Sequence, residues 1–181
     1  MSDIRLLSAE ELPQIGLLDT SQVIERIYDL APPDGTGGGL LLHECEISPL
    51  ETPSWGQNEI ATRMTLWRRN HAEGCQFWGA FEDDHLVGFL LLSCVPQNGA
   101  LEIYSIFVDR QHRAKGIGAS LVSRAEEYCR TSKIRYIYVT TTLDGPAIRF
   151  YLKTGFHFVG LHRRAYNHPG GQAAFIKEIL L

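Results

Sequence analysis

The sequence predicts an α/β fold, in which one domain carries a mixed, mostly antiparallel sheet with helices on both faces. Three apolar runs separated by short polar turns occupy residues 76–108 and indicate an antiparallel meander. A helix pattern, a strand pattern, a second helix pattern and two closing strands follow. This order adds strands to the meander and places helices on the sheet. The 181 residues are enough for one substantial core.

The N-terminal part, residues 1–75, is expected to be a variable, substrate-side portion. Ser8 and Glu11 have capping-box spacing, which predicts a short helix start that Pro13 soon disturbs. The apolar positions of residues 23–30 fit a helix, while their residue types also suit a strand.

A loop and a helix complete this part. Residues 32–39 are rich in proline and glycine and predict a loop before an apolar run at residues 40–47. No helix follows this loop directly, so its glycines favour a connection over a phosphate-binding site. Asn58 is the expected N-cap of a helix over residues 59–70.

Residues 76–181 form the predicted core. The meander strands are expected at residues 76–81, 86–95 and 100–108. A helix from Gly116 to about Thr131 follows. Residues 135–141 then form a strand whose poor alternation indicates burial on both faces.

The C-terminal end of the core is predicted to contain a helix and two strands. Pro146 suits the first turn of the helix, and Gly155 suits the position just after its end. Residues 156–159 and 173–180 are expected to be the closing strands.

Charge and composition exclude several classes of protein. The net charge is -4, from 17 basic and 21 acidic residues, and gives no reason to expect nucleic acid as a partner. No apolar segment has the length of a membrane span, and the first residues lack the layout of a signal peptide. The sequence therefore favours a cytoplasmic protein without nucleic-acid or membrane partners.

The cysteines and histidines predict no metal site. No CxxC pair occurs, and no histidine lies at zinc-ligand spacing from a cysteine. Reduced, buried thiols are expected rather than functional ones, which fits a reducing compartment. The cysteines are Cys45, Cys75, Cys94 and Cys129.

The most informative stretch is residues 106–118, with the sequence IFVDRQHRAKGIG. An apolar strand runs into a short basic loop and then into a helix that begins at paired glycines. Such glycines let a ligand approach free backbone N–H groups, which attract phosphate together with the helix dipole. Arg110, Arg113 and Lys115 add positive charge at the same place. Neither a P-loop nor a GxGxxG fingerprint is present.

The spacing Arg113-x-x-Gly116-x-Gly118, after a strand that ends in Val-Asp, is similar to the acetyl-CoA loop of the GNAT N-acetyltransferase superfamily. Residues 147–156, AIRFYLKTGF, resemble the A-x-x-F-Y-x-K-x-G-F segment of the same family. The resemblance covers residues 78–181. It implies a GNAT-like fold with splayed central strands, the fourth and the fifth, between which the pantetheine arm of acetyl-CoA enters.

The resemblance also implies a set of cofactor-binding residues. In the family, the end of the fourth strand pairs with the pantetheine like an added strand, and the loop backbone binds the pyrophosphate. A strand-four amide, here that of Ile106, faces the thioester oxygen. Asp144 stands where the family usually has asparagine. The implied residues are Ile106, Phe107, Val108, Arg113, Ala114, Lys115, Gly116, Ile117, Gly118, Ala119 and Asp144.

Two residues are candidates for proton transfer. Tyr151 is the candidate acid, because the family often has a tyrosine near the sulfur here and a pKa of about 10 keeps it protonated. The alternative is a tyrosine that only packs. Glu102 is the candidate base, because the histone-acetylating branch has a catalytic glutamate at the matching strand position; the alternative is a surface glutamate. Alternation predicts one face shared by Glu102, Tyr104, Ile106 and Val108.

Two departures from related subfamilies concern the substrate. Ribosomal N-terminal acetyltransferases commonly carry a catalytic glutamate in strand five, where this chain has Val139. Streptothricin acetyltransferases have an acidic loop before the last strand, where this chain has His162, Arg163 and Arg164. A basic loop would repel a polycationic antibiotic. It could instead bind the CoA 3′-phosphate or an acidic substrate, or form a solvated rim.

These observations predict an acetyl-CoA-dependent N-acetyltransferase in which a primary amine attacks the thioester directly. A non-catalytic acyl-CoA-binding module is the alternative from another class, because its cofactor loop would look the same. Among enzymes, a small-molecule amine and a protein N-terminal or lysine amine both remain open as substrates. A homodimer remains open as the assembly.

Overall fold

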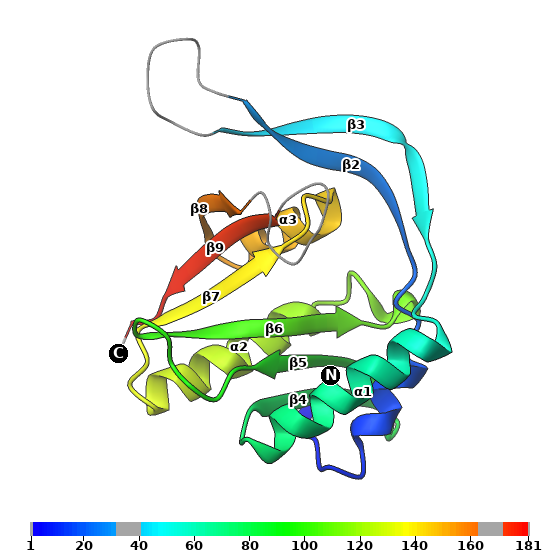
Figure 1. Cartoon of the computed structure of the whole chain (residues 1–181), viewed down its shortest axis with the longest axis vertical. Helices are drawn as coiled ribbons and strands as arrows, with labels where there is room; N and C mark the ends of the chain where they lie inside the picture. The colour runs from blue at the N-terminus through cyan, green and yellow to red at the C-terminus, as the bar shows by residue number, and fades with distance from the viewer. Residues whose placement is uncertain (1, 32–40, 163–171, 181) are drawn as a thin grey trace. The chain divides into compact units, whose positions relative to one another are not determined.

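The computed structural model describes residues 2–31, 41–162 and 172–180 (Figure 1). The predicted loop at residues 32–39 and the basic residues Arg163 and Arg164 lie outside these ranges. The chain forms two compact units. The first comprises Met1–Gln22, Pro53–Tyr138 and Glu178–Leu181, and the second comprises Val23–Thr52 and Val139–Lys177.

A sheet forms the centre of the first unit. Its strand order is β1-β4-β5-β6, with antiparallel neighbours, and the beginning of β7 joins β6 in parallel. The predicted meander is confirmed, with its second strand ending at Leu92 rather than Val95, while β1 has no counterpart among the predicted elements. The bounds are β1 (Asp3–Leu6), β4 (Gln76–Glu82), β5 (His85–Leu92), β6 (Ala100–Val108) and β7 (Tyr136–Thr141).

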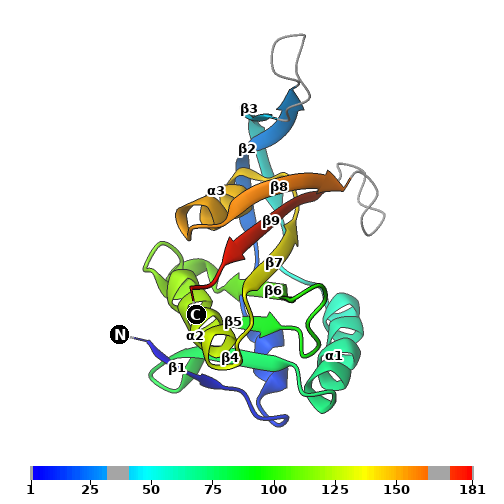
Figure 2. The ribbon, with the colours of Figure 1, turned by 90° about the vertical axis from the view of Figure 1, so that its left-hand side faces the viewer.

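Two helices cover opposite faces of this sheet, α1 (Gln57–Ala72) and α2 (Ile117–Thr131) (Figure 2). The N-cap of α1 is Gly56 and not Asn58, so this helix begins two residues earlier than predicted. Trp67 of α1 is 1% exposed and packs over the sheet with Phe89, at a ring-centroid distance of 5.7 Å. The predicted helix after Gly116 is confirmed as α2.

Two 3-10 helices also belong to the first unit, η1 (Leu12–Leu17) and η2 (Arg110–His112). The carboxylate of Glu11 accepts a hydrogen bond from the N–H of Ser8 at 2.9 Å, which is one half of the predicted capping box. A 3-10 helix follows it, with Pro13 in its first turn.

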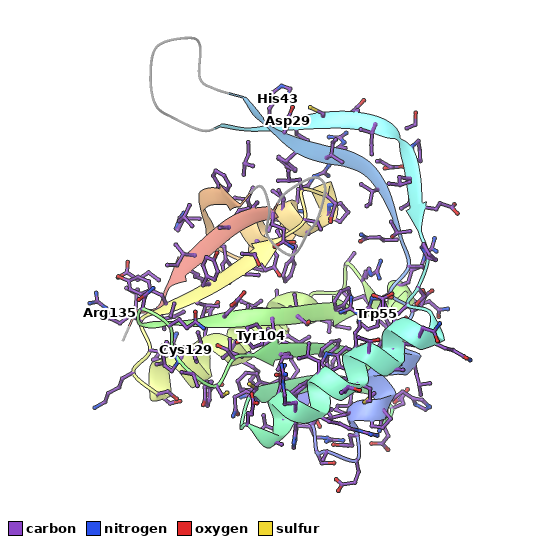
Figure 3. All side chains as sticks on the ribbon, viewed as in Figure 1. Asp29, His43, Trp55, Tyr104, Cys129 and Arg135 are labelled. Atoms are coloured by element: carbon purple, nitrogen blue, oxygen red, sulfur yellow. The ribbon has the colours of Figure 1, made fainter. Side chains whose placement is uncertain are left out.

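β6 contains an extra residue, Tyr104 (Figure 3). Leu91 of β5 pairs with Ser105, and the next residue, Leu92, pairs with Ile103. Two positions along β6 therefore correspond to one position along β5, which defines a β-bulge. A bulge shifts the alternation of side chains by one position.

The bulge corrects the predicted common face of β6. Ile106 and Val108 lie on the face of Ile103, whereas Glu102 lies on the opposite face with Phe107. Phe107 packs in the core beneath α1, with its ring centroid 4.6 Å from that of Trp55. The prediction that one face holds Glu102, Tyr104, Ile106 and Val108 is therefore wrong.

The second unit contains the paired strands β2 (Gln22–Ala31) and β3 (Leu41–Thr52) and the strand order β7-β9-β8. The strands β8 (His157–His162) and β9 (Gln172–Glu178) are antiparallel. Residues 23–30, ambiguous in the sequence, lie within a strand. The N–H of Tyr28 donates to the carbonyl oxygen of Leu143 at 2.7 Å, so a distant segment of the chain stabilises the extended form.

Candidate active site

The predicted phosphate-binding loop joins β6 to α2. Gly116, the N-cap of α2, has a φ of 84° and no side-chain cap. Ala114, two residues earlier, has a φ of 61°. Left-handed residues of this kind turn backbone N–H groups towards a concave side, where anions bind. The first turn of α2 thus presents N–H groups that a phosphate can cap.

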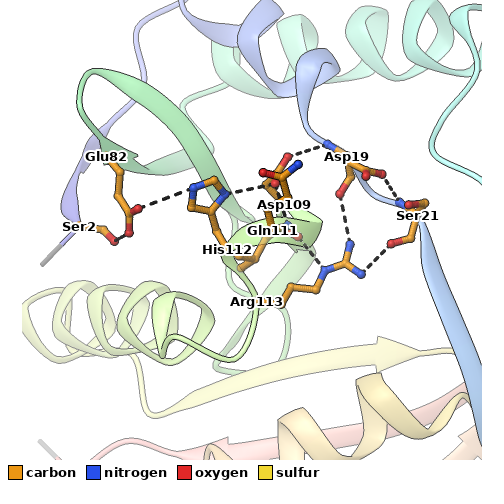
Figure 4. Close-up of polar contacts among 9 residues, drawn as sticks. Ser2, Asp19, Ser21, Glu82, Asp109, Gln111, His112 and Arg113 are labelled. Carbon is orange, nitrogen blue, oxygen red and sulfur yellow. Dashed lines mark hydrogen bonds and ion pairs between the residues drawn. The ribbon is translucent and has the colours of Figure 1, made fainter.

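The guanidinium group of Arg113 is hydrogen-bonded to backbone carbonyl oxygens (Figure 4). Nε donates to Val108 at 2.9 Å, Nη1 donates to Ser21 at 2.7 Å, and Nη2 lies 3.3 Å from its acceptor on Asp19. Burial lowers the pKa of Arg113, but an arginine remains charged at neutral pH. Its hydrogen bonds fasten the loop to residues 19–21.

Asp109 also connects the loop to residues 19–21, in this case as a hydrogen-bond acceptor. Its carboxylate accepts hydrogen bonds from the N–H groups of Asp19, at 2.9 Å, and Gln111, at 3.0 Å. Burial opposes the effect, but these bonds lower the pKa of Asp109. His112 Nδ1 lies 3.2 Å from this carboxylate, and its Nε2 lies 3.7 Å from Glu82 (Figure 4). The loop is therefore held by side chains on both sides of η2.

One edge of β6 is paired over only part of its length. Its ladder with β7 joins Ala100–Glu102 to Tyr136–Tyr138. Residues 103–108 pair with β5 on the other edge, and within the described chain no strand ladder continues beside them on the β7 side. An extended ligand could add to such an edge as a strand does. The residues expected to contact pantetheine, Ile106, Phe107 and Val108, belong to this segment.

Glu102 lies in the first unit, on the part of β6 that pairs with β7. Its backbone N–H donates to Ser93 Oγ at 2.9 Å, and its carbonyl oxygen accepts from the N–H of Ser93 at 2.9 Å. The side chain is half-buried, and this burial raises the pKa of the Glu102 carboxyl. A carboxylate with a raised pKa is a stronger base than a surface carboxylate.

Tyr151 lies in the second unit, in α3 (Gly145–Lys153), and is 5% exposed. Its ring stacks on that of Phe175 at a centroid distance of 5.9 Å and meets Phe156 edge-on at 5.4 Å. Burial, with the charge of Asp144 as a second cause, raises the pKa of the Tyr151 hydroxyl. The hydroxyl is therefore protonated at neutral pH, as a proton donor must be.

Asp144 is the N-cap of α3. Its carboxylate accepts a hydrogen bond from the N–H of Ala147 at 2.9 Å and another from the hydroxyl of Thr142. Pro146 lies in the first turn and Gly155, with a φ of 83°, follows the helix end, as predicted. Capping of α3 explains why an acidic residue occupies this position. A contact between Asp144 and the cofactor stays a prediction.

Three residues that support this site carry no signal in the sequence. Ser93 follows β5 and fixes the backbone of Glu102, while Asp19 and Ser21 provide the acceptors for Arg113 and a donor for Asp109. Asp19 and Ser21 act here through backbone groups, which are the same in every residue, and Ser93 adds its hydroxyl to its N–H. Only the three-dimensional contact reveals them.

Across the described ranges, no group of three or more metal-ligating side chains comes together. None of the helices described there combines the length and the apolar character that crossing a membrane requires.

Comparison with known proteins identifies the family to which the chain belongs. The model of the acetyltransferase (GNAT) family matches residues 42–156, more than half of the chain. The chain belongs to this family. The predicted class, an N-acetyltransferase that uses acetyl-CoA, is thereby confirmed, as is the predicted fold.

Two of the related proteins carry the names of different acetyltransferases. A streptothricin acetyltransferase of Streptomyces lavendulae is 28% identical over 150 residues, covering 82% of this chain and 78% of the relative. The N-alpha-acetyltransferase RimI of Mycobacterium tuberculosis is 31% identical over 106 residues, covering 58% of this chain and 63% of the relative.

Solved structures share the fold. A nourseothricin acetyltransferase superposes with a TM-score of 0.79 at 23% identity, covering 99% of both chains. A putative streptothricin acetyltransferase from Bacillus anthracis str. Ames, in complex with acetyl coenzyme A, gives a TM-score of 0.80 at 17% identity, covering 98% of this chain and 97% of that one.

Proposed function

We propose that the chain transfers the acetyl group of acetyl-CoA directly to a primary amine, without an acyl-enzyme. The observation that carries the proposal is the continuous path formed by β6, the left-handed loop and α2. The β7-side edge of residues 103–108 suits the extended pantetheine, and the uncapped start of α2 suits the pyrophosphate. Arg113 and Asp109 keep that path in place.

The catalytic roles are divided between two side chains and one backbone group. Glu102 accepts a proton from the amine, directly or through water, because burial raises its pKa. The N–H of Ile106 stabilises the negative charge that develops on the thioester oxygen. Tyr151 donates a proton to the departing thiolate, since its raised pKa keeps the hydroxyl protonated.

We propose a small-molecule amine as the acceptor. The relative that covers 82% of this chain acts, by its name, on streptothricin. A peptide amine is the second candidate, favoured by the N-alpha-acetyltransferase relative, which covers 58%. The predicted basic loop at residues 162–168 bears on this choice, but it lies mostly outside the described residues.

A panel of amines tests both candidates. The purified protein is mixed with acetyl-CoA and with aminoglycoside-type antibiotics, polyamines, amino acids or short peptides, and free thiol release is followed. Turnover of a small amine at a kcat/KM well above that of any peptide is the expected result. Preferential turnover of peptides would overturn the small-molecule assignment, and no turnover by a protein that binds acetyl-CoA would favour a sensing module.

We further propose that the protein works in the cytoplasm, a reducing compartment that suits a chain with four free cysteines. A homodimer is the assembly to test. Light scattering over a range of protein concentrations distinguishes a dimer from a monomer.

A further inference from the structure

Two of the four cysteines lie against each other. The Sγ atoms of Cys75 and Cys94 are 3.0 Å apart, and the thiol of Cys75 donates to the sulfur of Cys94. The other two are placed differently. Cys45 lies in the second unit with His43 at 3.3 Å, and Cys129 is buried in α2.

The sheet register explains why these two side chains meet. Gln76, the first residue of β4, pairs with Leu92, the last residue of β5. Cys75 immediately precedes that pair and Cys94 follows it by two residues, so the two thiols lie at the same end of two adjacent antiparallel strands. The N–H of Cys75 also donates to the carbonyl oxygen of Asn70 at 2.9 Å. Backbone pairing therefore holds the thiols together.

We propose that Cys75 and Cys94 are a modification site, at which a low-molecular-weight disulfide such as oxidised glutathione converts the two thiols into a reversible intramolecular disulfide. The sulfur atoms need to approach by only about 1 Å to reach bonding length. The oxidant is reduced to two molecules of glutathione, and the two thiol protons pass to the two departing thiolates.

Exposure sets the order of the two exchange steps. Cys94 is partly exposed, whereas Cys75 is 6% exposed, and burial, with the Cys94 thiol as a second cause, raises the pKa of Cys75. The Cys94 thiolate first attacks one sulfur of oxidised glutathione and releases one glutathione. Cys75 then attacks Cys94 Sγ, which breaks the mixed disulfide and releases the second glutathione.

The disulfide would lie next to Ser93, which hydrogen-bonds to the backbone of β6 at Glu102. Cys94 follows Ser93, whose N–H and hydroxyl hold the backbone of Glu102. The cross-link would therefore restrain the segment on which Glu102 depends. This consequence rests on the proposed role of Glu102, but formation of the disulfide does not.

Intact mass and peptide mapping test the site independently of acetyl transfer. The folded, reduced protein is incubated with a series of glutathione redox buffers and quenched with an alkylating agent. The expected product has lost two hydrogens, resists alkylation at both positions and yields a linked peptide containing Cys75 and Cys94. Dithiothreitol should restore both thiols.

Variants separate this pair from the other cysteines. Cys75→Ser should stop the reaction at a single glutathione adduct on Cys94, whereas Cys45→Ser and Cys129→Ser should form the disulfide as the wild type does. The proposal is overturned if the wild type accumulates a stable glutathione adduct without the linked peptide. It is equally overturned if the folded protein remains fully alkylatable at Cys94 under oxidising buffer.

Discussion

The carbonyl oxygen of Ser21 accepts a hydrogen bond of 2.7 Å from Nη1 of Arg113, joining chain positions far apart in sequence. The same guanidinium also donates to Val108 and Asp19. Arg113 belongs to the motif that the sequence associates with the cofactor, yet its side chain organises protein backbone. Its contribution is therefore expected to appear first in stability and in the position of the loop.

Replacing Arg113 with alanine should lower the free energy of unfolding by about 2–3 kcal/mol, because three partly buried carbonyl groups lose a charged donor. Arg113→Lys should recover little of this loss, since one ammonium group cannot match a planar fork. Urea unfolding measures the effect. Arg68→Ala is the matched control, because Arg68 is exposed on α1 and should change stability by less than about 0.5 kcal/mol. An Arg113→Ala protein as stable as the control would contradict this account.

Gly116→Val should abolish detectable acetyl-CoA binding, because a branched side chain would stand between the loop backbone and the pyrophosphate. The φ of 84° also makes this change strained, by about 1–2 kcal/mol. Gly74→Val provides the control, since Gly74 has a φ of 87° and open space for a Cβ but lies outside the loop. Titration calorimetry should show binding by the control only. Equal affinities for the two folded variants would remove the loop from the binding site.

Glu102→Gln should leave acetyl-CoA affinity unchanged and lower turnover about 10²–10⁴-fold if Glu102 is the base. The deficit should narrow at high pH, where more of the amine is already neutral. Steady-state rates across pH, with an amine identified in the panel, measure this. A deficit that stays constant with pH would indicate a structural role.

The same substitution should stabilise the fold at neutral pH. Burial raises the pKa of Glu102, so the folded protein binds this proton more tightly than the unfolded chain does. Stability is therefore lost as pH rises from the ordinary glutamate pKa of 4.5 through the folded pKa. Glu102→Gln should unfold at higher urea concentration than the wild type above this window and at a similar concentration below it. A variant less stable at neutral pH would show that the carboxylate is favourably solvated.

Tyr151→Phe should fold normally, because the stacked ring is retained. Its kcat should fall by about 10²-fold, near the lower end of acid–base effects, because a thiolate is a tolerable leaving group. The amine KM should change little, since the proton is needed in the transition state. Steady-state kinetics of the variant and the wild type measure both kcat and the amine KM. A wild-type kcat would leave Tyr151 with packing alone, and solvent would supply the proton.

Local signals in the sequence predicted the elements with strong residue preferences. Gly116, Pro146 and Gly155 mark helix ends because few other residues suit those backbone positions, and all three lie as expected. The start of α1 was misplaced because Asn58 is a good cap residue, but Gly56 provides the cap without any side chain. Backbone conformation decided that boundary.

Long-range contacts account for what the sequence did not reveal. Pairing with β3 and the hydrogen bond from Tyr28 to Leu143 make residues 23–30 a strand, and no local pattern encodes those partners. The bulge at Tyr104 has no glycine or other local marker, so strict alternation assigned Ile106 to the wrong face. Arg113 was predicted from its charge, and its acceptors are carbonyl groups of a distant segment.

Tyr104 is the extra residue of the bulge in β6. Most substitutions there should be tolerated, because the residue is 45% exposed and its place in the register does not depend on residue type. Deleting Tyr104 should leave a regular ladder, because Ile103 and Ser105 would become neighbours that still pair with Leu92 and Leu91, and every later side chain would keep its face. The face that each residue of β6 presents thus follows from its partner on β5 and not from its distance along the chain.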